Sequence, residues 1–111
     1  MDQTRLKKVE RLMQKELSIV FQQNSYTSYQ GKLISVTSVR LSSDISIAKV
    51  YLSIFPSENI EEILELINAS TGKVKYEIGK KLRNQLRKIP DLKFFIDDSL
   101  DYADRIDELL N

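Results

Sequence analysis

The sequence contains no cysteine and no histidine among its 111 residues. Without cysteine, the chain cannot form disulfides or thiolate metal sites and has no cysteine nucleophile. Without histidine as well, it lacks the most common metal ligands and the most common general base. We therefore predict a protein that is not an enzyme and that uses no metal and no cofactor.

Long apolar runs are absent too. No stretch approaches the roughly 18 consecutive apolar residues that a membrane-spanning helix requires, and the N-terminus carries Asp2 and Arg5 where a secretory signal would be apolar. With 41% hydrophobic residues the composition is that of a globular protein. We expect a single domain over residues 1–111, located in the cytoplasm, with no membrane contact and no small-molecule substrate.

Charge is abundant and is sorted along the chain, although the net charge is only +1. Residues 73–90 hold seven basic residues and a single acidic one, Glu77. Residues 56–72 hold four acidic residues and no basic one, and residues 91–111 hold seven acidic and two basic ones. This polarised distribution predicts an anionic partner for the basic stretch.

The hydrophobic pattern predicts the element order α-β-β-α-α-β-α. Apolar spacings of three and four predict helices over residues 4–22, 58–69, 73–89 and 99–110. Alternation rich in β-branched residues predicts strands over residues 33–41, 47–54 and 92–96, of which the first two form an antiparallel hairpin. Residues 23–31 are polar and aperiodic, which predicts a connecting loop.

A break is expected between the acidic helix and the basic helix. Glycine is poor inside a helix by about 1 kcal/mol and tolerates positive φ, so Gly72 is expected to bend the chain there. The predicted kink comprises Ala69, Ser70, Thr71 and Gly72.

Basic side chains are expected on the outer faces of the first helix and of the helix after the kink. Clustered Lys and Arg attract phosphates through charge and counterion release, which favours RNA as the partner, and the alternative is a merely solvated helix face. The predicted RNA-binding residues are Arg5, Lys7, Lys8, Arg11, Lys15, Lys73, Lys80, Lys81, Arg83, Arg87 and Lys88. Candidates for stacking on unpaired bases are Tyr26, Tyr29 and Tyr76, and for Tyr76 simple packing is the favoured interpretation.

Several separated strings resemble the bacterial ribosome-binding factor A family along nearly the whole chain. They are Arg5-Leu-Lys-Lys-Val9 with Gln14-Lys-Glu16, Ile34-Ser-Val-Thr-Ser-Val39, Ser43-Asp44, Ala48-Lys-Val-Tyr51, and Pro90-Asp-Leu-Lys-Phe-Phe-Ile-Asp97-Asp98-Ser99. Their order and ordinary spacing carry the resemblance, because any one string alone would be weak.

The resemblance implies an α+β fold of the type II KH kind, α-β-β-α-α-β, with a three-stranded sheet packed on helices and here an additional short C-terminal helix. KH domains grip nucleotides with a GxxG loop, which this chain lacks, whereas the family carries an Ala-x-Gly kink. The junction here reads either as Ala-x-x-Gly or as Ser-x-Gly with Ser70 in the alanine place. The family's basic C-terminal tail is not expected, because residues 99–111 are acidic.

For function, the resemblance implies a monomeric ribosome assembly factor. Such a factor binds the immature small (30S) ribosomal subunit and its 16S ribosomal RNA near the decoding region, and assists late maturation. A second interpretation stays open, a protein-interaction adaptor that uses its polarised charged faces.

Overall fold

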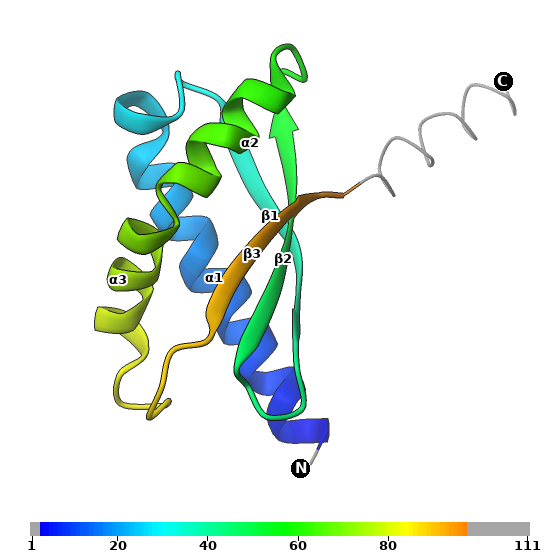
Figure 1. The fold of residues 1–111 in the computed structure, drawn as a ribbon, viewed down its shortest axis with the longest axis vertical. Coiled ribbons are helices and arrows are strands. Elements are labelled where there is room, and N and C mark those ends of the chain that lie inside the picture. The colour runs from blue at the N-terminus through cyan, green and yellow to red at the C-terminus, as the bar shows by residue number, and fades with distance from the viewer. Residues whose placement is uncertain (1–2, 98–111) are drawn as a thin grey trace, which may run out of the picture.

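The computed structural model of the chain describes residues 3–97, which form three helices and three strands (Figure 1). The elements are α1 (Gln3–Ser28), β1 (Leu33–Leu41), β2 (Ile47–Phe55), α2 (Ile60–Ala69), α3 (Thr71–Leu82) and β3 (Asp91–Ile96). The predicted order α-β-β-α-α-β is confirmed for this part of the chain. The helix predicted over residues 99–110 lies outside the described residues.

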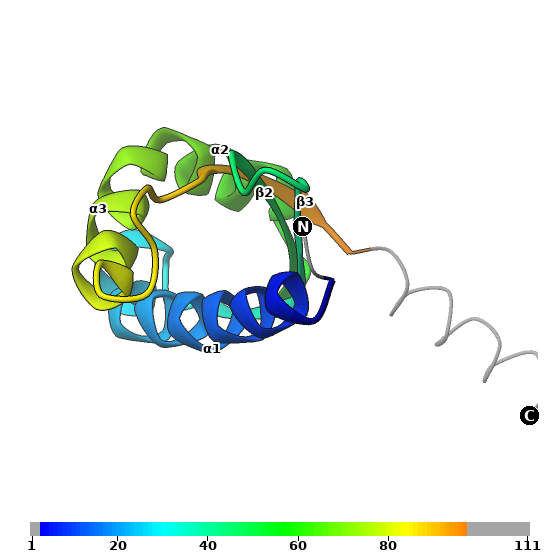
Figure 2. The same cartoon turned by 90° about the horizontal axis from the view of Figure 1, so that it is seen from below.

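The three strands form one mixed sheet with the order β1-β2-β3. The hairpin strands β1 and β2 are antiparallel, as predicted, and β3 runs parallel to the central strand β2. Figure 2 shows α1, α2 and α3 on one side of this sheet. Strand side chains that point towards the helices, among them Leu52 and Phe94, form the core together with helix side chains such as Phe21. Because successive strand residues point to opposite faces, the other strand residues form a second face, here called the open face, which no element within residues 3–97 covers.

An irregularity in β1 changes which of its residues face the core. The pairing with β2 shifts between Val36 and Ser38, which leaves Thr37 as the extra residue of a β-bulge. Val36 before the bulge and Val39 after it are both buried. Gln14 of α1 stabilises the bulge, because its side-chain amide donates to the carbonyl oxygens of Val36 and Thr37 at 3.0 and 3.2 Å. The strict alternation predicted for this strand is therefore wrong beyond Val36.

Helix α1 is longer than the sequence pattern predicts. It continues through residues 23–28, because no glycine or proline interrupts that polar stretch. The first residues with left-handed backbone are Gln30 and Gly31, at φ values of 57° and 73°. The Gly31 amide donates to the Ser25 carbonyl at 2.9 Å and closes the helix end. The loop prediction is thus wrong for residues 23–28, whereas residues 29–31 do form a turn, in which the Tyr29 side chain is buried.

Helix α3 is shorter than predicted. It ends at Leu82, whereas the hydrophobic pattern predicts a continuation to residue 89. The amides of Gln85 and Leu86 both donate to the Leu82 carbonyl at 2.9 Å, which forms a turn that still buries Leu86. Pro90 follows, and the residue before a proline disfavours helical backbone. The basic residues that lie on this segment after the helix are Arg83, Arg87 and Lys88.

A single residue, Ser70, separates α2 from α3. Its backbone leaves helical geometry at φ −98° and ψ 11°, and its hydroxyl donates to the Ile67 carbonyl at 3.0 Å. The same hydroxyl lies 2.9 Å from the Tyr29 hydroxyl, which ties the break to the end of α1. Gly72 lies in the first turn of α3 and does not have positive φ. The prediction that Gly72 bends the chain is therefore wrong.

Replacing Gly72 with alanine is expected to stabilise the fold by up to about 1 kcal/mol, because alanine favours a helix over glycine. Apart from its chain neighbours and the adjacent backbone of its own helix, a Cβ at Gly72 would meet no atom within 4 Å. The matched control is Gly31→Ala, which places alanine at a φ of +73° and should cost at least about 1 kcal/mol. Urea unfolding measures both free energies. A clear destabilisation by Gly72→Ala would show that the bend depends on Gly72 after all.

Candidate nucleic-acid interface

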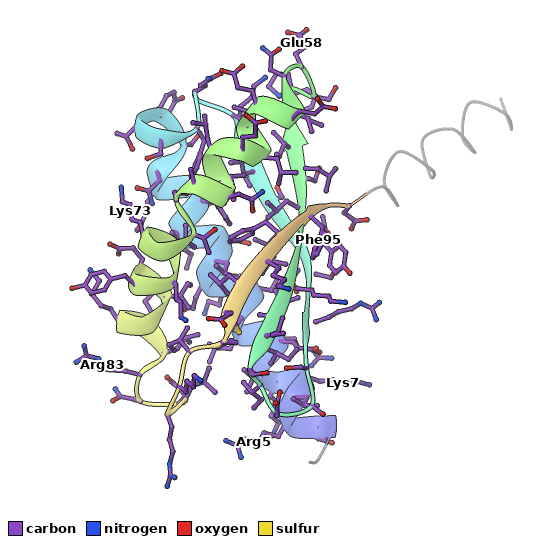
Figure 3. The ribbon with its side chains drawn as sticks, viewed as in Figure 1. Arg5, Lys7, Glu58, Lys73, Arg83 and Phe95 are labelled. Carbon is purple, nitrogen blue, oxygen red and sulfur yellow. The ribbon has the colours of Figure 1, made fainter. Side chains whose placement is uncertain are left out.

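Exposed basic and acidic side chains are unevenly distributed between the two ends of the molecule. Figure 3 shows Arg5 and Arg83 at the end where α1 begins and α3 finishes, with Glu58 at the other end. Beside Glu58, Glu61 and Glu62 lie exposed in the first turn of α2. The charge segregation seen along the sequence therefore becomes a charge difference between the two ends of the fold.

All five predicted basic residues of α1 are exposed. Lys8, Arg11 and Lys15 recur at spacings of three and four, so they share the helix face opposite the buried stripe. Arg5 and Lys7 lie in the first turns, and Lys7 points towards the side of the hairpin in Figure 3. This helix presents a continuous basic surface to solvent.

Two basic residues of α3 are held by carboxylates of neighbouring elements. Lys75 Nζ lies 2.7 Å from an Asp91 carboxylate oxygen at the start of β3, and Lys81 Nζ lies 3.4 Å from a Glu16 carboxylate oxygen of α1. The hydrogen bond and the charge of Lys75 hold the pKa of Asp91 below its usual range. Lys75 and Lys81 therefore join α3 to the rest of the fold, and of the two only Lys81 is a predicted RNA contact.

A hollow at the basic end brings together residues that are far apart in the sequence. Arg5 lines it from the start of α1, Arg87 and Lys88 line it from the segment after α3, and Asp44 lines it from the β1–β2 turn. Cations that converge on a concave surface raise the local potential that an anion meets. Here the structure joins residues of the two separate basic stretches of the sequence.

Asp44 in this hollow stays ionised far below neutral pH. Hydrogen bonds from the Ser46 and Ser42 hydroxyls and from the Ser46 amide lower its pKa from 3.8 to about 2. Because the folded-state pKa is lowered, the carboxylate contributes stability above its ordinary pKa, and the contribution is lost as pH falls towards 2. We expect an NMR titration to place its midpoint near pH 2 and Ser46→Ala to raise it. An ordinary midpoint in the parent would contradict this geometry.

Tyr76 on α3 is 67% exposed, so the packing interpretation is wrong for this residue. Lys80 Nζ lies 5.0 Å from the centre of the Tyr76 ring and 3.4 Å from a Glu77 carboxylate oxygen. Tyr76, Lys80 and Arg83 line one shallow hollow. Of the other two stacking candidates, Tyr29 is buried and Tyr26 is 90% exposed. An exposed ring flanked by cations is a suitable platform for an unpaired base.

Within residues 3–97 no three acidic, histidine or cysteine side chains lie close enough together to hold a metal ion. None of the helices described is long and apolar enough to cross a membrane.

Comparison with known proteins identifies relatives of this chain. The family model described as ribosome-binding factor A matches residues 5–110. The ribosome-binding factor A of Christiangramia forsetii is 47% identical over 105 residues, which cover 94% of this chain and 80% of that protein. The crystal structure of ribosome-binding factor A from Thermus thermophilus superposes with a TM-score of 0.69 at 23% identity, covering 82% of this chain and 94% of that one.

A second Thermus thermophilus structure shows where such a fold has been placed. It is a homology model of that organism's ribosome-binding factor A, fitted into a cryo-EM map of its complex with the 30S subunit. It superposes with a TM-score of 0.67 at 23% identity and covers 82% of this chain and 93% of that one. The match over residues 5–110 and the high identity to a curated relative agree with the resemblance seen in the sequence strings, and the chain belongs to the ribosome-binding factor A family.

Proposed function

We propose that this protein is a ribosome assembly factor that binds the immature small (30S) subunit through its 16S ribosomal RNA and assists late maturation. Membership of the ribosome-binding factor A family supports this function, as does the fitting of a protein of the same fold into a 30S complex. The protein acts in the cytoplasm as a monomer, without a cofactor and without a catalytic step.

The observation that carries the proposal is the convergence of basic residues from three parts of the chain at one end of the fold. These parts are α1, the outer face of α3 and the segment after α3. The residues concerned are exposed, and of them only Lys80 has an ion pair in the described part of the chain, with Glu77 of its own helix: Arg5, Lys7, Lys8, Arg11, Lys15, Lys80, Arg83, Arg87 and Lys88. Lys73 is exposed as well, but it lies at the start of α3, away from this end (Figure 3). Such a set positions a protein on phosphates and carries little sequence information by itself.

The physical activity is the stabilisation of one RNA conformation over another. A ligand shifts an equilibrium only by its difference in affinity for the two states, so the protein must bind the immature RNA arrangement more tightly than the mature one. The exposed acidic residues of α2 at the opposite end, Glu61 and Glu62 among them, repel phosphates and orient the molecule with its basic end towards the RNA.

Cosedimentation with purified immature and mature small subunits tests the function. We expect the protein to sediment with immature subunits and to be recovered in much lower amount with mature ones. Equal recovery with both would contradict the preference for the immature state. Absence from both would contradict subunit binding altogether.

The adaptor function remains the second candidate, since the exposed acidic end of α2 offers a surface for a basic protein partner. Purified 16S ribosomal RNA added as a competitor separates the two functions. If the protein docks through RNA, free RNA should release it from the subunit. Retention of the protein on the subunit at saturating free RNA would favour a protein partner.

A further inference from the structure

The open face of the sheet carries two rows of side chains that cross neighbouring strands. The first row, here called the cation row, is Arg40 of β1, Lys49 of β2 and Lys93 of β3, which are direct cross-strand partners. The second row, here called the aromatic row, contains Tyr51 of β2 and its partner Phe95 of β3. Along β2 the two rows are two residues apart, about 7 Å in a strand, so they lie on the same face.

The cation row is an unusual arrangement for a folded protein by itself. Like charges directly opposite each other on neighbouring strands destabilise a sheet. All three side chains of the row are exposed, and within residues 3–97 none of them forms an ion pair, because the ion pairs found there involve Lys75, Lys80 and Lys81. An anionic ligand across the three strands would remove this repulsion.

The aromatic row adds stacking surface next to these charges. The rings of Tyr51 and Phe95 are stacked, with centroids 5.6 Å apart and an interplanar angle of 29°. Phe95 is 40% exposed and points away from the helices in Figure 3. Two shallow hollows adjoin Tyr51 and share Arg40, and the first also contains Ser38 and Asp97 while the second contains Lys49. Each hollow therefore combines an aromatic wall with a cation.

We propose that the open face is a second RNA-binding site, for a short single-stranded segment whose unpaired bases stack on Tyr51 and Phe95 and whose phosphates lie along the cation row. Sequence-tolerant binding of single strands combines these two elements, a basic track for the backbone and aromatic rings for the bases. This site lies across the sheet from α1 and α3, so it is separate from the basic residues of these two helices. It depends on the proposed function only for the expectation that the partner is RNA.

The probe for this site is a fluorescein-labelled oligouridine too short to form a duplex. Replacing Tyr51 and Phe95 together by leucine keeps apolar side chains in the sheet and removes both rings. We expect the affinity, measured by fluorescence anisotropy, to fall at least about tenfold. The exchange Tyr51→Phe with Phe95→Tyr keeps both rings and should retain the affinity of the parent.

A second pair of substitutions tests the cation row. Lys49→Gln with Lys93→Gln should reduce the log–log slope of oligouridine affinity against salt by about 1.4. Amide shifts in two-dimensional NMR spectra of the full chain should map the oligouridine to β1, β2 and β3 around Arg40, Tyr51 and Phe95. Shifts confined to α1 and α3 would overturn the proposal, and so would a folded leucine variant with parent affinity.

Other occupants of the open face would reveal themselves in the same spectra. Sheet amides that shift with protein concentration in the absence of RNA would assign the face to a second copy of the chain and overturn the proposal. The oligouridine experiments test this site without small subunits, so they can fail or succeed separately from the cosedimentation test of the proposed function. If the protein binds oligouridine through Tyr51 but does not cosediment with small subunits, only the proposed function is contradicted. If the protein cosediments normally but its oligouridine binding does not require Tyr51, only this site is contradicted.

Discussion

Replacement of Lys80, Arg83 and Arg87 by glutamate is expected to weaken binding to immature small subunits by more than about 100-fold. Three positive charges facing phosphates become three negative ones, and like-charge contacts in an interface cost several kcal/mol. All three side chains are exposed, and none belongs to the core. The loss of binding should therefore occur in a folded protein.

The cost of this triple substitution in stability is small. Glutamate at residue 80 loses the ion pair with Glu77 and places like charges three residues apart, which costs about 0.2–0.5 kcal/mol. Acidic residues near the end of α3 oppose its dipole, by about 0.3–1 kcal/mol each. The matched control is Lys80→Arg, Arg83→Lys and Arg87→Lys, which keeps every charge and should keep most of the binding. If the glutamate variant unfolds in a cooperative thermal transition and still binds immature subunits as tightly as the parent, then Lys80, Arg83 and Arg87 do not belong to the binding site.

The affinity for RNA should fall steeply with salt. Each phosphate contact contributes about −0.7 to the slope of log affinity against log salt on single-stranded or irregular RNA. The basic set at the end of the fold offers at least about six cations for such contacts, so the slope should reach at least about −4. An increase from about 50 to about 200 mM monovalent salt then weakens binding by roughly 300-fold. Filter binding or anisotropy over a salt series measures this slope.

A neutral variant gives the salt experiment its control. Changing Lys80, Arg83 and Arg87 to glutamine should make the slope less negative by about 2, because three phosphate contacts are lost. A slope near zero in the parent would exclude phosphate contacts as the source of affinity. A parent slope of about −4 that the glutamine variant shares would place the contacts elsewhere on the protein.

Most of the fold could be predicted from the sequence because its elements carry clean apolar periods. Strand β1 has the predicted bounds, β2 exceeds its predicted end by one residue, and β3 starts one residue earlier than predicted. The buried stripe Val74, Ile78 and Leu82 lies where the helical spacing places it. The local hydrophobic pattern determines these features, and the tertiary contacts of the fold agree with it.

The errors arose where tertiary contacts override local pattern. The spacing of four residues between Leu82 and Leu86 is compatible with a helix and with a turn. The structure has a turn, in which the amides of Gln85 and Leu86 donate to the Leu82 carbonyl before the chain continues to β3. At the break, the Ser70 hydroxyl is hydrogen-bonded to the Tyr29 hydroxyl, which lies 41 residues away in the sequence. Lys32 is another example, since its ammonium is buried and donates to the carbonyl oxygens of Pro56 and Glu58 at 3.1 and 2.8 Å. No spacing rule relates such partners.

For the candidate site, the sequence predicts the residue types but not their grouping. Charge counting finds the basic residues of both stretches, yet it cannot tell that Arg5 and Lys88 line one hollow or that Lys81 is paired with Glu16. Of the cation row, Arg40 and Lys49 can be recognised in the sequence as hairpin charges that could extend a basic surface, although such charges usually mark only the solvent-facing side of a sheet. Lys93 could not be added to them, because no local pattern shows that β3 pairs with β2. The sequence signal for a cation beside an aromatic ring on one face is the spacing of two residues between Lys49 and Tyr51 on β2.

The parallel pairing of β3 with the central strand has a consequence for how the chain folds as it is made. Ile47 pairs with Asp91 and Leu52 with Ile96, and α2 and α3 form the crossover between the two strands. Such non-local pairing must wait until loop closure has been achieved, which slows folding. A nascent chain that ends before residue 91 already carries the basic residues of α1 and α3 but lacks β3, and with it Lys93 and Phe95. The complete sheet, and with it the face that carries Lys49, Tyr51 and Phe95 side by side with Lys93, can therefore form only after β3 has been synthesised.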